Sequence, residues 1–560
     1  MQLYLPSKLI RKFYTVSLFL CVLFIAAFTG CGNKKKATSV STNPQPTLDS
    51  VFITQYMKST PEFKEELDWA KKFYRERKFK LGWFKNHELV PQATKMFSVI
   101  NKSNEEGLDP KDYQLFNLEE KLKELEDAEK DTAKFNELEK QIDIALSATY
   151  FNWASDYYRG LVMPQENKEV DWDVKKNKIK LHKALETMLG ERKSKYDYAS
   201  FAPLHQDYAN LKKALARYRQ IQKSGGWPVI PANASFTPGQ PSTAALQLRI
   251  RLADFIPSNE KATADSTTYS PELVNAVKRF QALHGISPDG KIGPGTIKLM
   301  NVPVQNRIRQ IIINMERWRW IPKSFEPSYL LVNIPEFKLH VIEKSKEVMT
   351  MKVIVGKEMN STPIFSDKLE HVVLSPYWNI PPNILREEIA PKIMSDPGYL
   401  DRLNMEVVTN KGNPVSAYDV DWGQAGSEGF QYIVRKKPGP KNDLGDVKFI
   451  FPNVDNIYLH DTPHDELFSQ SKRGFSHGCV RLEQPLKLAE YLLRNIPGWD
   501  NASIRRQIST GKERYISVKE KLPVYLVYFT AKADANGHVQ FYDDLYGHDT
   551  KLASMYFSKL

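Results

Sequence analysis

The chain has 560 residues, of which 26% are charged and 41% are hydrophobic, and its formal net charge is +13 at pH 7. This length predicts several domains. The sequence contains no long low-complexity block and no convincing internal repeat, which excludes a repeat array. The positive charge suits an anionic polymer or a lipid surface as partner, although it is spread widely enough to serve solubility alone.

The first 30 residues have the features of an export signal. Three basic residues precede an apolar run over 18–28, which is too short for a comfortable transmembrane helix. The run ends in a small residue followed by Cys31, which resembles a bacterial lipobox. We therefore predict a lipoprotein signal peptide over 1–30 and a lipid on Cys31. An ordinary signal peptide or an uncleaved anchor are the alternatives, and each places the rest of the chain outside the cytoplasm.

A tether and a helical region are predicted next. Residues 31–50 are rich in Lys, Ser, Thr and Pro, which is typical of a flexible tether. Over 51–228 apolar residues such as Leu67 and Tyr74 recur at helical spacing among Glu and Lys. This pattern predicts a helical scaffold domain, and no group of side chains within it indicates catalysis.

A compact segment over 240–303 follows a Pro-rich connection, and three short helices are predicted in it. It resembles the three-helix peptidoglycan-binding module, on the motif Phe280-Gln281, His284-Gly285-Ile286, Asp289-Gly290 and Gly293-Pro294-Gly295-Thr296. The resemblance implies a domain that delivers the chain to the cell wall. His284 could touch a ligand, and a core or surface histidine is the alternative interpretation.

The pattern changes to a mostly β domain over 328–530. Apolar, β-branched runs such as 329–334 and 351–356 are separated by charged turns. The middle of this region, about 383–446, is less strand-like and predicts an inserted, lid-like segment. Residues 531–560 are predicted to form a C-terminal tail. The fold class predicted for the whole chain is therefore α+β and multidomain.

One thiol remains once the signal and the lipidation site are set aside. It is Cys479, in the run Ser476-His477-Gly478-Cys479-Val480-Arg481. Exported cysteines usually pair, and this one has no partner in the mature chain; an inert buried thiol is the alternative. His460 ends a predicted strand, and Cys479 is predicted to precede a helix. A histidine that takes the thiol proton would make Cys479 a nucleophile, and Gly478 would let backbone amides face an oxyanion.

The order of these residues resembles a known family. The pattern His460-x15-Ser476-His477-Gly478-Cys479-Val480-Arg481 resembles the signature of YkuD-like L,D-transpeptidases. Further segments look like the large branch of this family, which joins a scaffold, a peptidoglycan-binding module and the catalytic domain: Asn314–Trp320, Val355-Gly356-Lys357, Thr362-Pro363, Pro376–Pro382, Pro440–Gly445 and Phe541–Gly547.

This resemblance implies a reaction. Cys479 would attack the carbonyl of the third residue of a peptidoglycan tetrapeptide stem, usually meso-diaminopimelate, and release D-Ala. The side-chain amine of a second stem would resolve the thioester into a 3–3 cross-link. His460 matches the family's general base and the backbone carbonyl of Asp461 its orienting acceptor, while His477, Gly478 and Cys479 match the oxyanion region. The family needs no metal and no diffusible cofactor, and carbapenems are expected to acylate the thiol.

Other residues near the motif have two interpretations each. Arg481, where many family members have Asn, could recognise a stem carboxylate or form a structural ion pair. Tyr377 and Trp378 could line the substrate channel or belong to the core. Ser476 is expected to be positional, bonding the local backbone. His477 is too close to Cys479 in sequence to be preferred over His460 as the base.

Competing functions follow from the same residues. Attack of water on the acyl-enzyme would give an L,D-carboxypeptidase or endopeptidase, and the sequence does not separate this from transpeptidation. A wall-binding lipoprotein without catalysis is the third interpretation. The expected partners are peptidoglycan stem peptides and glycan, and the membrane through the lipid on Cys31, with no nucleic acid. We expect a membrane-anchored lipoprotein of the cell envelope that faces the periplasm.

Overall fold

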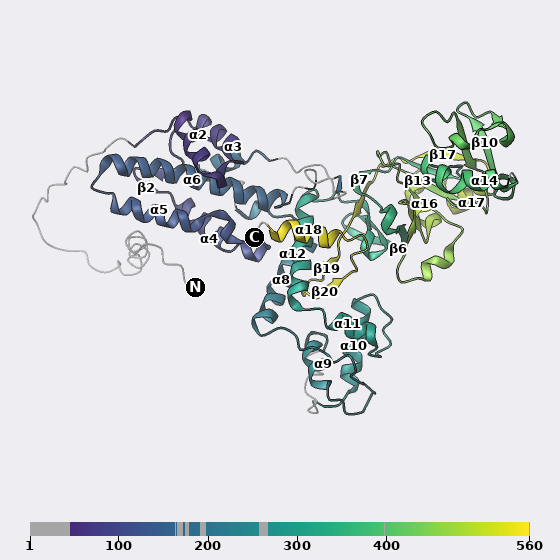
Figure 1. Ribbon diagram of the computed structural model, residues 1–560, viewed down its shortest axis with the longest axis horizontal. Helices are drawn as coiled ribbons and strands as arrows, with labels where there is room; N and C mark the ends of the chain where they lie inside the picture. Colours follow the sequence, from purple (N-terminus) through teal and green to yellow (C-terminus); the bar gives the residue numbers. More distant parts are fainter. Residues whose placement is uncertain are drawn as a thin grey trace, which may run out of the picture. The chain divides into compact units, whose positions relative to one another are not determined.

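The computed structural model describes residues 45–162, 164, 172–173, 179–190, 198–256, 267–396 and 398–558. These residues form two compact units: the first within Met1–Leu161 and Asn177–Ala202, the second within Val162–Lys176 and Pro203–Lys559 (Figure 1). The predicted signal peptide, Cys31 and most of the predicted tether lie outside the described residues. Within the described ranges, no helix is both long enough and apolar enough to cross a membrane.

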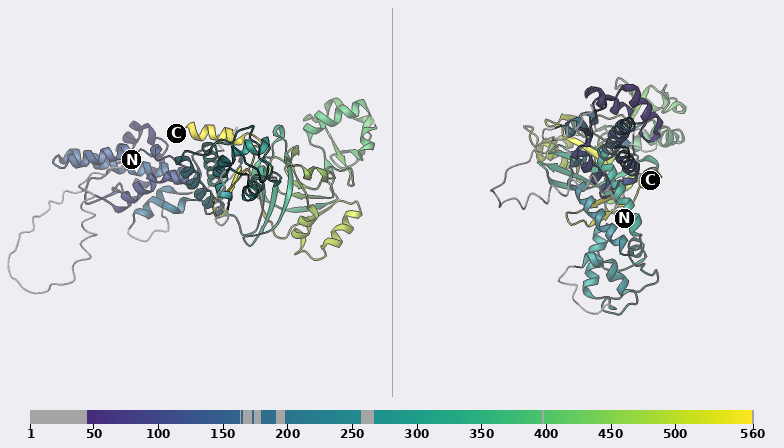
Figure 2. Two further views of the ribbon diagram at one scale, coloured as in Figure 1. Left: turned by 90° about the horizontal axis from the view of Figure 1, so that it is seen from below. Right: turned by 90° about the vertical axis from the view of Figure 1, so that its left-hand side faces the viewer.

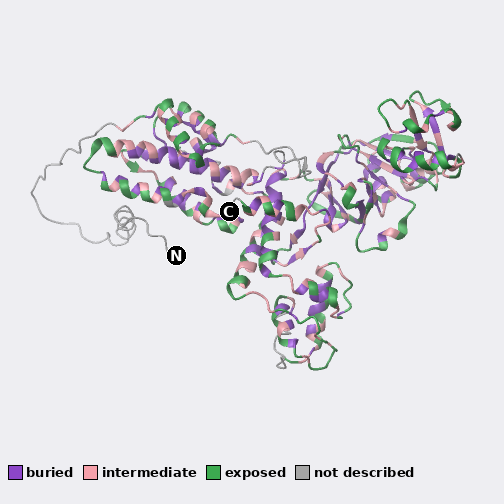
Figure 3. Cartoon of the chain, in the orientation of Figure 1, coloured by how far each residue is buried: buried purple, intermediate pink, exposed green. Residues whose placement is uncertain are grey.

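The first unit is helical, as the sequence predicts, and α6 (Thr132–Arg159) is its centre. The side chain of Asp131 caps α6 by accepting from two N–H groups of its first turn. The long, largely buried face of this helix is visible in Figure 3. The helices that contact it are α2 (Ser50–Ser59), α3 (Leu67–Glu76), α4 (Pro91–Asn101), α5 (Leu115–Asp127) and α7 (Leu181–Leu189), which Figure 2 shows from two further sides.

A buried carboxylate joins α6 to Gly82 and Trp83, the two residues before the short hairpin β1 (Phe84–Lys85)–β2 (Glu88–Leu89). Asp143 accepts hydrogen bonds from the backbone N–H of Gly82 at 2.9 Å and of Trp83 at 2.7 Å, and from the Tyr74 hydroxyl at 2.7 Å. Burial raises the pKa of Asp143, and these hydrogen bonds oppose the shift. The carboxylate therefore satisfies two backbone N–H groups, those of Gly82 and Trp83, that would otherwise be buried without a described acceptor.

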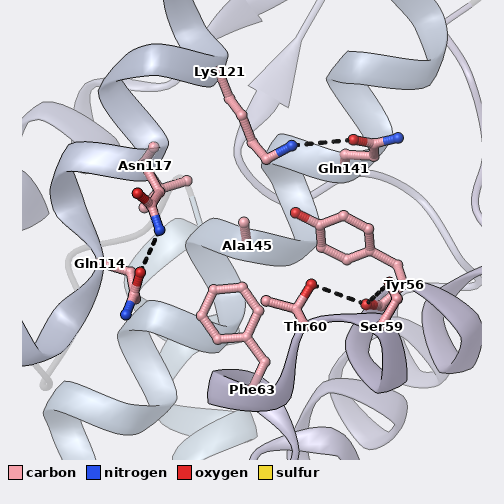
Figure 4. Close-up of a pocket in the computed structure, with 10 residues that line it drawn as sticks. Tyr56, Ser59, Thr60, Phe63, Gln114, Asn117, Lys121, Gln141 and Ala145 are labelled. Carbon is pink, nitrogen blue, oxygen red and sulfur yellow. Dashed lines mark hydrogen bonds between the residues drawn. The ribbon is translucent and has the colours of Figure 1, made fainter.

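A cavity of about 350 Å³ lies among α2, α5 and α6 of the first unit (Figure 4). Tyr56 and Phe63 line it together with several amide and hydroxyl side chains. Lys121 donates to Gln141 at 3.3 Å, and other polar groups in the lining bond one another in the same way. Because its polar groups largely satisfy each other, the cavity gives no indication of a particular ligand.

In the second unit, α8 (Gln206–Lys223) packs against α12 (Val304–Trp320), and the three short helices predicted between them are confirmed. They are α9 (Ala245–Arg251), α10 (Pro271–Leu283) and α11 (Pro294–Met300). Buried Gln281 bridges Gly290 and Lys291, and so holds the turn before α11. His284 stacks on Phe280 at 4.0 Å between centroids, and burial lowers its pKa to about 3. These contacts favour the packing role for His284.

A large curled sheet forms the body of the predicted β domain, and it joins twelve described strands. Along its main path the order is β17-β8-β13-β14-β16-β6-β5-β4-β18-β7-β3, and β15 pairs with β6. The bounds are β3 (Trp172–Asp173), β4 (Tyr329–Asn333), β5 (Lys338–Glu343), β6 (Lys346–Gly356), β7 (Ile364–Lys368), β8 (His371–Leu374), β13 (Val447–Ile450), β14 (Leu459–His460), β15 (Gly474–Ser476), β16 (Val480–Leu482), β17 (Arg514–Ser517) and β18 (Pro523–Val527). Helices α16 (Pro485–Leu493) and α17 (Asn501–Ser509) pack near its β17 end.

The segment predicted as an insertion has a core of its own, formed by residues from Ile380 to Val434. It contains more strand than the sequence indicates, because β10 pairs with both β11 and β12 in a separate four-stranded sheet. Its elements are β9 (Trp378–Asn379), η11 (Leu385–Ile389), α14 (Ala390–Ser395), α15 (Tyr399–Arg402), β10 (Met405–Thr409), β11 (Pro414–Val415) and β12 (Tyr432–Lys436). In Figure 1, α14 and β10 are neighbours in green.

The C-terminal segment is ordered, and buried charges on α12 hold it in place. It forms the hairpin β19 (Ala531–Ala533)–β20 (Val539–Phe541) and the helix α18 (His548–Ser558). Arg317 of α12 pairs with Asp549 at 2.5 Å, and Asn314 exchanges two hydrogen bonds with Thr530. Residues 531–558 are therefore a packed part of the second unit.

We expect Asp143→Ala to destabilise the first unit by roughly 3–5 kcal/mol, because it leaves the Gly82 and Trp83 N–H groups buried without an acceptor. Hydrogen exchange of the peptide that contains Gly82 and Trp83 in the full chain measures this locally. Exposed Glu124→Ala is the control and should change stability by less than about 0.5 kcal/mol. Equal exchange in the two variants would contradict the role of Asp143.

Candidate active site

Three polar side chains form a row across adjacent strands of the large sheet. Lys448 of β13 lies opposite His460 of β14 in an antiparallel pair, and His460 lies beside Arg481 of β16 in a parallel pair. Residues in register on neighbouring strands project from the same face of a sheet. The chain thus gathers a histidine and two cations on one face, although they lie far apart in sequence.

Cys479 immediately precedes β16 and joins this row. The helix predicted after Cys479 is α16, which begins at Pro485, and the strand Val480–Leu482, which the sequence did not indicate, pairs with both β14 and β6 before it. The Val480 N–H donates to the Tyr458 carbonyl at 3.2 Å, so Tyr458 lies beside the thiol. The Cys479 sulfur lies 4.0 Å from the Asn456 carbonyl oxygen.

The thiol is partly exposed to solvent, yet protein atoms surround the sulfur closely. Burial raises the pKa of the Cys479 thiol above its ordinary value. The backbone N–H and the phenol of Tyr458, and the positive charges of Lys448 and Arg481, act in the opposite direction. These are the groups that favour a thiolate here.

The loop before Cys479 is held by side-chain hydrogen bonds. The Ser476 hydroxyl donates to the Cys479 carbonyl at 2.6 Å and accepts from the Gly478 N–H at 3.1 Å, which is the positional role predicted for Ser476. The Thr362 hydroxyl donates to the Gly478 carbonyl at 2.7 Å. Gly478 has φ +118°, a conformation that other residues rarely adopt, and a Cβ there would lie 3.4 Å from Ile457.

These bonds bear on which amides could stabilise an oxyanion. The Gly478 N–H already donates a hydrogen bond to the Ser476 hydroxyl, so it is not free to donate to an oxyanion at the thiol. The N–H groups of His477 and Cys479 have no acceptor among the described contacts. They are therefore the better candidates within the predicted oxyanion region.

His460 is buried, with 4% of its surface exposed, and its ring is oriented by the backbone. Its Nδ1 lies 2.5 Å from the Asp461 carbonyl oxygen, the arrangement that the family resemblance implies. The Asp461 carboxylate accepts from the N–H groups of Asp446 and Thr462, both at 2.7 Å, and so fixes this peptide. Burial lowers the pKa of His460 to about 3, and the charges of Arg481 and Lys448 add to that shift.

The neutral imidazole therefore predominates at neutral pH, as a general base requires. Within the described contacts, however, no hydrogen bond joins His460 to the Cys479 thiol. The two residues lie on adjacent parallel chains, two register positions apart. Catalytic hydrogen bonds are often long in a free enzyme and tighten when substrate binds.

Arg481 is half-buried and none of the ion pairs between described residues includes it. Its Nε is buried without a hydrogen-bond partner. Asp443, the carboxylate that faces it, is bound to Lys436. A partly desolvated guanidinium without a tight partner fits recognition of a carboxylate better than a structural ion pair.

The other predicted residues lie at the border with the insertion. Trp378 and Cys479 both face the Tyr458 phenol, so the structure brings Trp378 to the site. The Tyr377 ring is covered by Arg435 at 4.1 Å. His477 bonds Glu388 of η11 at 2.8 Å, which ties the inserted segment to the loop before Cys479.

Sequence reasoning missed Lys448, Tyr458 and Thr362 as site residues. A lysine between the buried residues Val447 and Phe449 of β13 is a signal that could have marked Lys448. Its pairing with His460 becomes known only from the fold. Among the described residues, no group of three or more His, Cys, Asp or Glu side chains could hold a metal ion.

Comparison with known proteins assigns three regions of the chain. Residues 68–215 match a family described as "Scaffold domain", residues 241–300 one described as "Putative peptidoglycan binding domain", and residues 327–518 one described as "L,D-transpeptidase catalytic domain". A protein of Haemophilus influenzae named "Putative L,D-transpeptidase" is 34% identical over 247 residues, which cover 44% of this chain and 49% of the relative. The chain thus spans about half the length of this curated relative.

Two solved structures are similar in part. One is an Ldtfm–avibactam carbamoyl enzyme, with 12% identity over 37% of this chain and 51% of that chain. The other is an L,D-transpeptidase of Xylanimonas cellulosilytica DSM 15894, with 14% identity over 53% of this chain and 99% of that chain. Both TM-scores are 0.16, so neither supports an argument about the site.

The lowered pKa of His460 predicts a pH dependence of stability. The folded value of about 3 lies below the ordinary 6.5, so the unfolded chain binds the proton first as the pH falls. The stability that His460 contributes is present above pH 6.5 and is lost as the pH falls towards 3. Between these values, His460→Gln should reduce the slope of unfolding free energy against pH by about 1.4 kcal/mol per pH unit. Equal slopes of unfolding free energy against pH for the two proteins, measured by urea unfolding between pH 4.5 and 6, would contradict this.

Proposed function

We propose that this chain, whose residues 327–518 belong to the L,D-transpeptidase catalytic domain family, forms 3–3 cross-links in peptidoglycan with Cys479 as the nucleophile. The observation that carries the proposal is the placement of a thiol beside a buried, neutral histidine on adjacent parallel chains. Two cations outside any described ion pair, Lys448 and Arg481, flank them. This arrangement suits an anionic substrate and a thiolate nucleophile.

In the first half-reaction, the Cys479 sulfur attacks the carbonyl carbon of the third stem residue, and His460 takes the thiol proton. The backbone carbonyl of Asp461 orients the imidazole and stabilises its protonated form during this step. The amides of His477 and Cys479 stabilise the oxyanion. Collapse of the intermediate breaks the amide bond to D-Ala, whose amine receives the proton from His460, and leaves a thioester.

In the second half-reaction, the side-chain amine of another stem's third residue attacks the thioester carbonyl. His460 takes a proton from this amine and returns it to the departing sulfur. The thiol is regenerated, and the new amide joins two third residues. No step requires a metal or a diffusible cofactor. A β-lactam ring offers the thiol a strained amide carbonyl, so carbapenems should acylate Cys479.

Substrate position depends on Arg481 in this proposal. Arg481 lies two residues beyond Cys479, on the same face of the sheet as His460, and its Nε has no hydrogen-bond partner. It binds a stem carboxylate and so sets the third residue against the sulfur. Trp378, which shares contacts with Tyr458, forms part of the same wall.

The remaining domains place the catalytic domain at its substrate. The peptidoglycan-binding domain over 241–300 holds the chain on the cell wall, and this region indicates a place in the cell envelope. We propose further that a lipid on Cys31 anchors the protein to a membrane on the periplasmic side. The signal over 1–30 then directs export, and the tether over 31–50 holds the folded domains away from the membrane.

Cys479→Ala should abolish both cross-linking and carbapenem acylation, because it removes the one thiol among the described residues. Mass spectrometry of muropeptides after incubation of the purified protein with a tetrapeptide-stem disaccharide checks this. A dimer joined between third residues supports the proposal, whereas tripeptide monomer alone indicates hydrolysis of the acyl-enzyme. Dimer formed by Cys479→Ala would refute the nucleophile. Binding of this variant to isolated sacculi serves as the folding control.

Arg481→Ala should raise KM by roughly 10- to 100-fold, because a charge-assisted hydrogen bond contributes about 1.5–3 kcal/mol. Stems in which a carboxylate is replaced by an amide identify the partner. The amidated stem should lower kcat/KM for the unaltered protein and have little further effect on Arg481→Ala. Additive losses would show that Arg481 does not bind that carboxylate.

A further inference from the structure

Lys448 is the charged residue of the site that the proposed reaction leaves without a role. It lies opposite His460 in the β13–β14 pair, and its ammonium stands 3.8 Å from the ring centroid of Tyr458. The side chain is half-buried, and none of the ion pairs between described residues includes it. A partly desolvated ammonium needs a compensating charge or dipole.

The groups around Lys448 identify that compensating charge. On the neighbouring segment that contains β14, it faces the Tyr458 phenol and the imidazole of His460. The Cys479 sulfur and the Glu513 carboxylate are the negative charges that act on it. Of these two, Cys479 also lies beside Tyr458, the ring on which the ammonium rests.

The surroundings of His460 explain why the thiolate needs this cation. In many thiol enzymes an imidazolium balances the charge of the thiolate. Here His460 is buried and has both Lys448 and Arg481 as positive neighbours, so an imidazolium is unfavourable in the resting site. The negative charge that develops on the sulfur as the thiol loses its proton therefore needs another cation to balance it.

Tyr458 provides the physical connection between Lys448 and the sulfur. Its phenol and its backbone N–H both face Cys479 and favour the anionic sulfur. A cation on the face of a phenol ring withdraws electron density and makes the hydroxyl a stronger donor. Lys448 thus acts on the sulfur directly through its charge and indirectly through Tyr458.

We propose that Lys448, seated on the ring of Tyr458, is the positioning residue that stabilises the thiolate of Cys479 when the thiol loses its proton. This inference rests on the proposed use of Cys479 as the nucleophile. Arg481 is then free to bind substrate, because Lys448 balances the charge of the deprotonated sulfur. His460 stays neutral and accepts a proton only while a thiol or an amine reacts.

The test is the pH dependence of Cys479 alkylation by iodoacetamide in the full-length protein, measured from pH 5 to 10. Mass spectrometry of the peptide that contains Cys479 separates its alkylation from that of Cys21 and Cys31. Lys448→Met should raise the pKa of the alkylation profile by about one unit, and slow alkylation at pH 7 about tenfold. Lys448→Arg should keep the profile close to that of the unaltered chain.

Lys392→Met is the matched control. Lys392 of α14 also stands over a phenol ring, that of Tyr399 at 5.7 Å, but Tyr399 packs against the core of the insertion. Its loss should leave the alkylation profile of Cys479 unchanged. Tyr458→Phe removes the hydroxyl and keeps the ring, so it should shift the profile in the same direction as Lys448→Met. In the Tyr458→Phe background, Lys448→Met should shift the profile by less than it does alone.

An unchanged profile in Lys448→Met would overturn the proposal, and so would equal shifts for Lys448→Met and Lys448→Arg. If Lys448→Met fails to fold, Tyr458→Phe and Lys448→Arg decide the question by the same criteria. The alkylation assay does not depend on cross-linking. A shifted profile in a protein that forms no dimer would refute the proposed transpeptidation and leave the role of Lys448 standing.

Discussion

The parallel pairing of β14 with β16 is the constraint on which the site depends. It sets Tyr458 and His460 on one chain against Cys479 and Arg481 on the next. Parallel neighbours cannot be joined by a tight turn, so the chain needs a crossover of a dozen or more residues between them. The 15 residues between His460 and Ser476 in the sequence signature are therefore long enough for the crossover that the parallel pairing of β14 and β16 requires.

Electrostatics then decides how the gathered groups behave. Burial keeps His460 neutral, and two cations on the same face make its protonation still harder. The same cations favour the thiolate of Cys479, whose own burial acts against it. In such a site the imidazole of His460 transfers protons, whereas nearby cations balance the charge of the thiolate. In other thiol enzymes the imidazolium does both.

Neighbouring elements supply the rigidity that such a site requires. Thr362 and Ser476 hold the loop at Gly478 from both sides, and Tyr546 donates to the Gly356 carbonyl beneath it. The insertion has an independent core, so it can contact the loop through Glu388 and His477 without being part of the large sheet. Buried charges of α12 fix the C-terminal helix in the same unit.

The sequence by itself determined the helical scaffold, the three-helix module and the change to β structure, and it indicated His460 and Cys479 as a candidate pair. Each of these rests on local patterns: apolar periodicity, turn residues, and rare residue types at a fixed spacing. Only the tertiary structure decided that Cys479 leads into a strand, that the insertion contains a sheet around β10, and that Lys448 and Tyr458 belong to the site. The reason is that strand pairing joins segments far apart in the chain, and no local pattern around Lys448 specifies that His460 will lie opposite it.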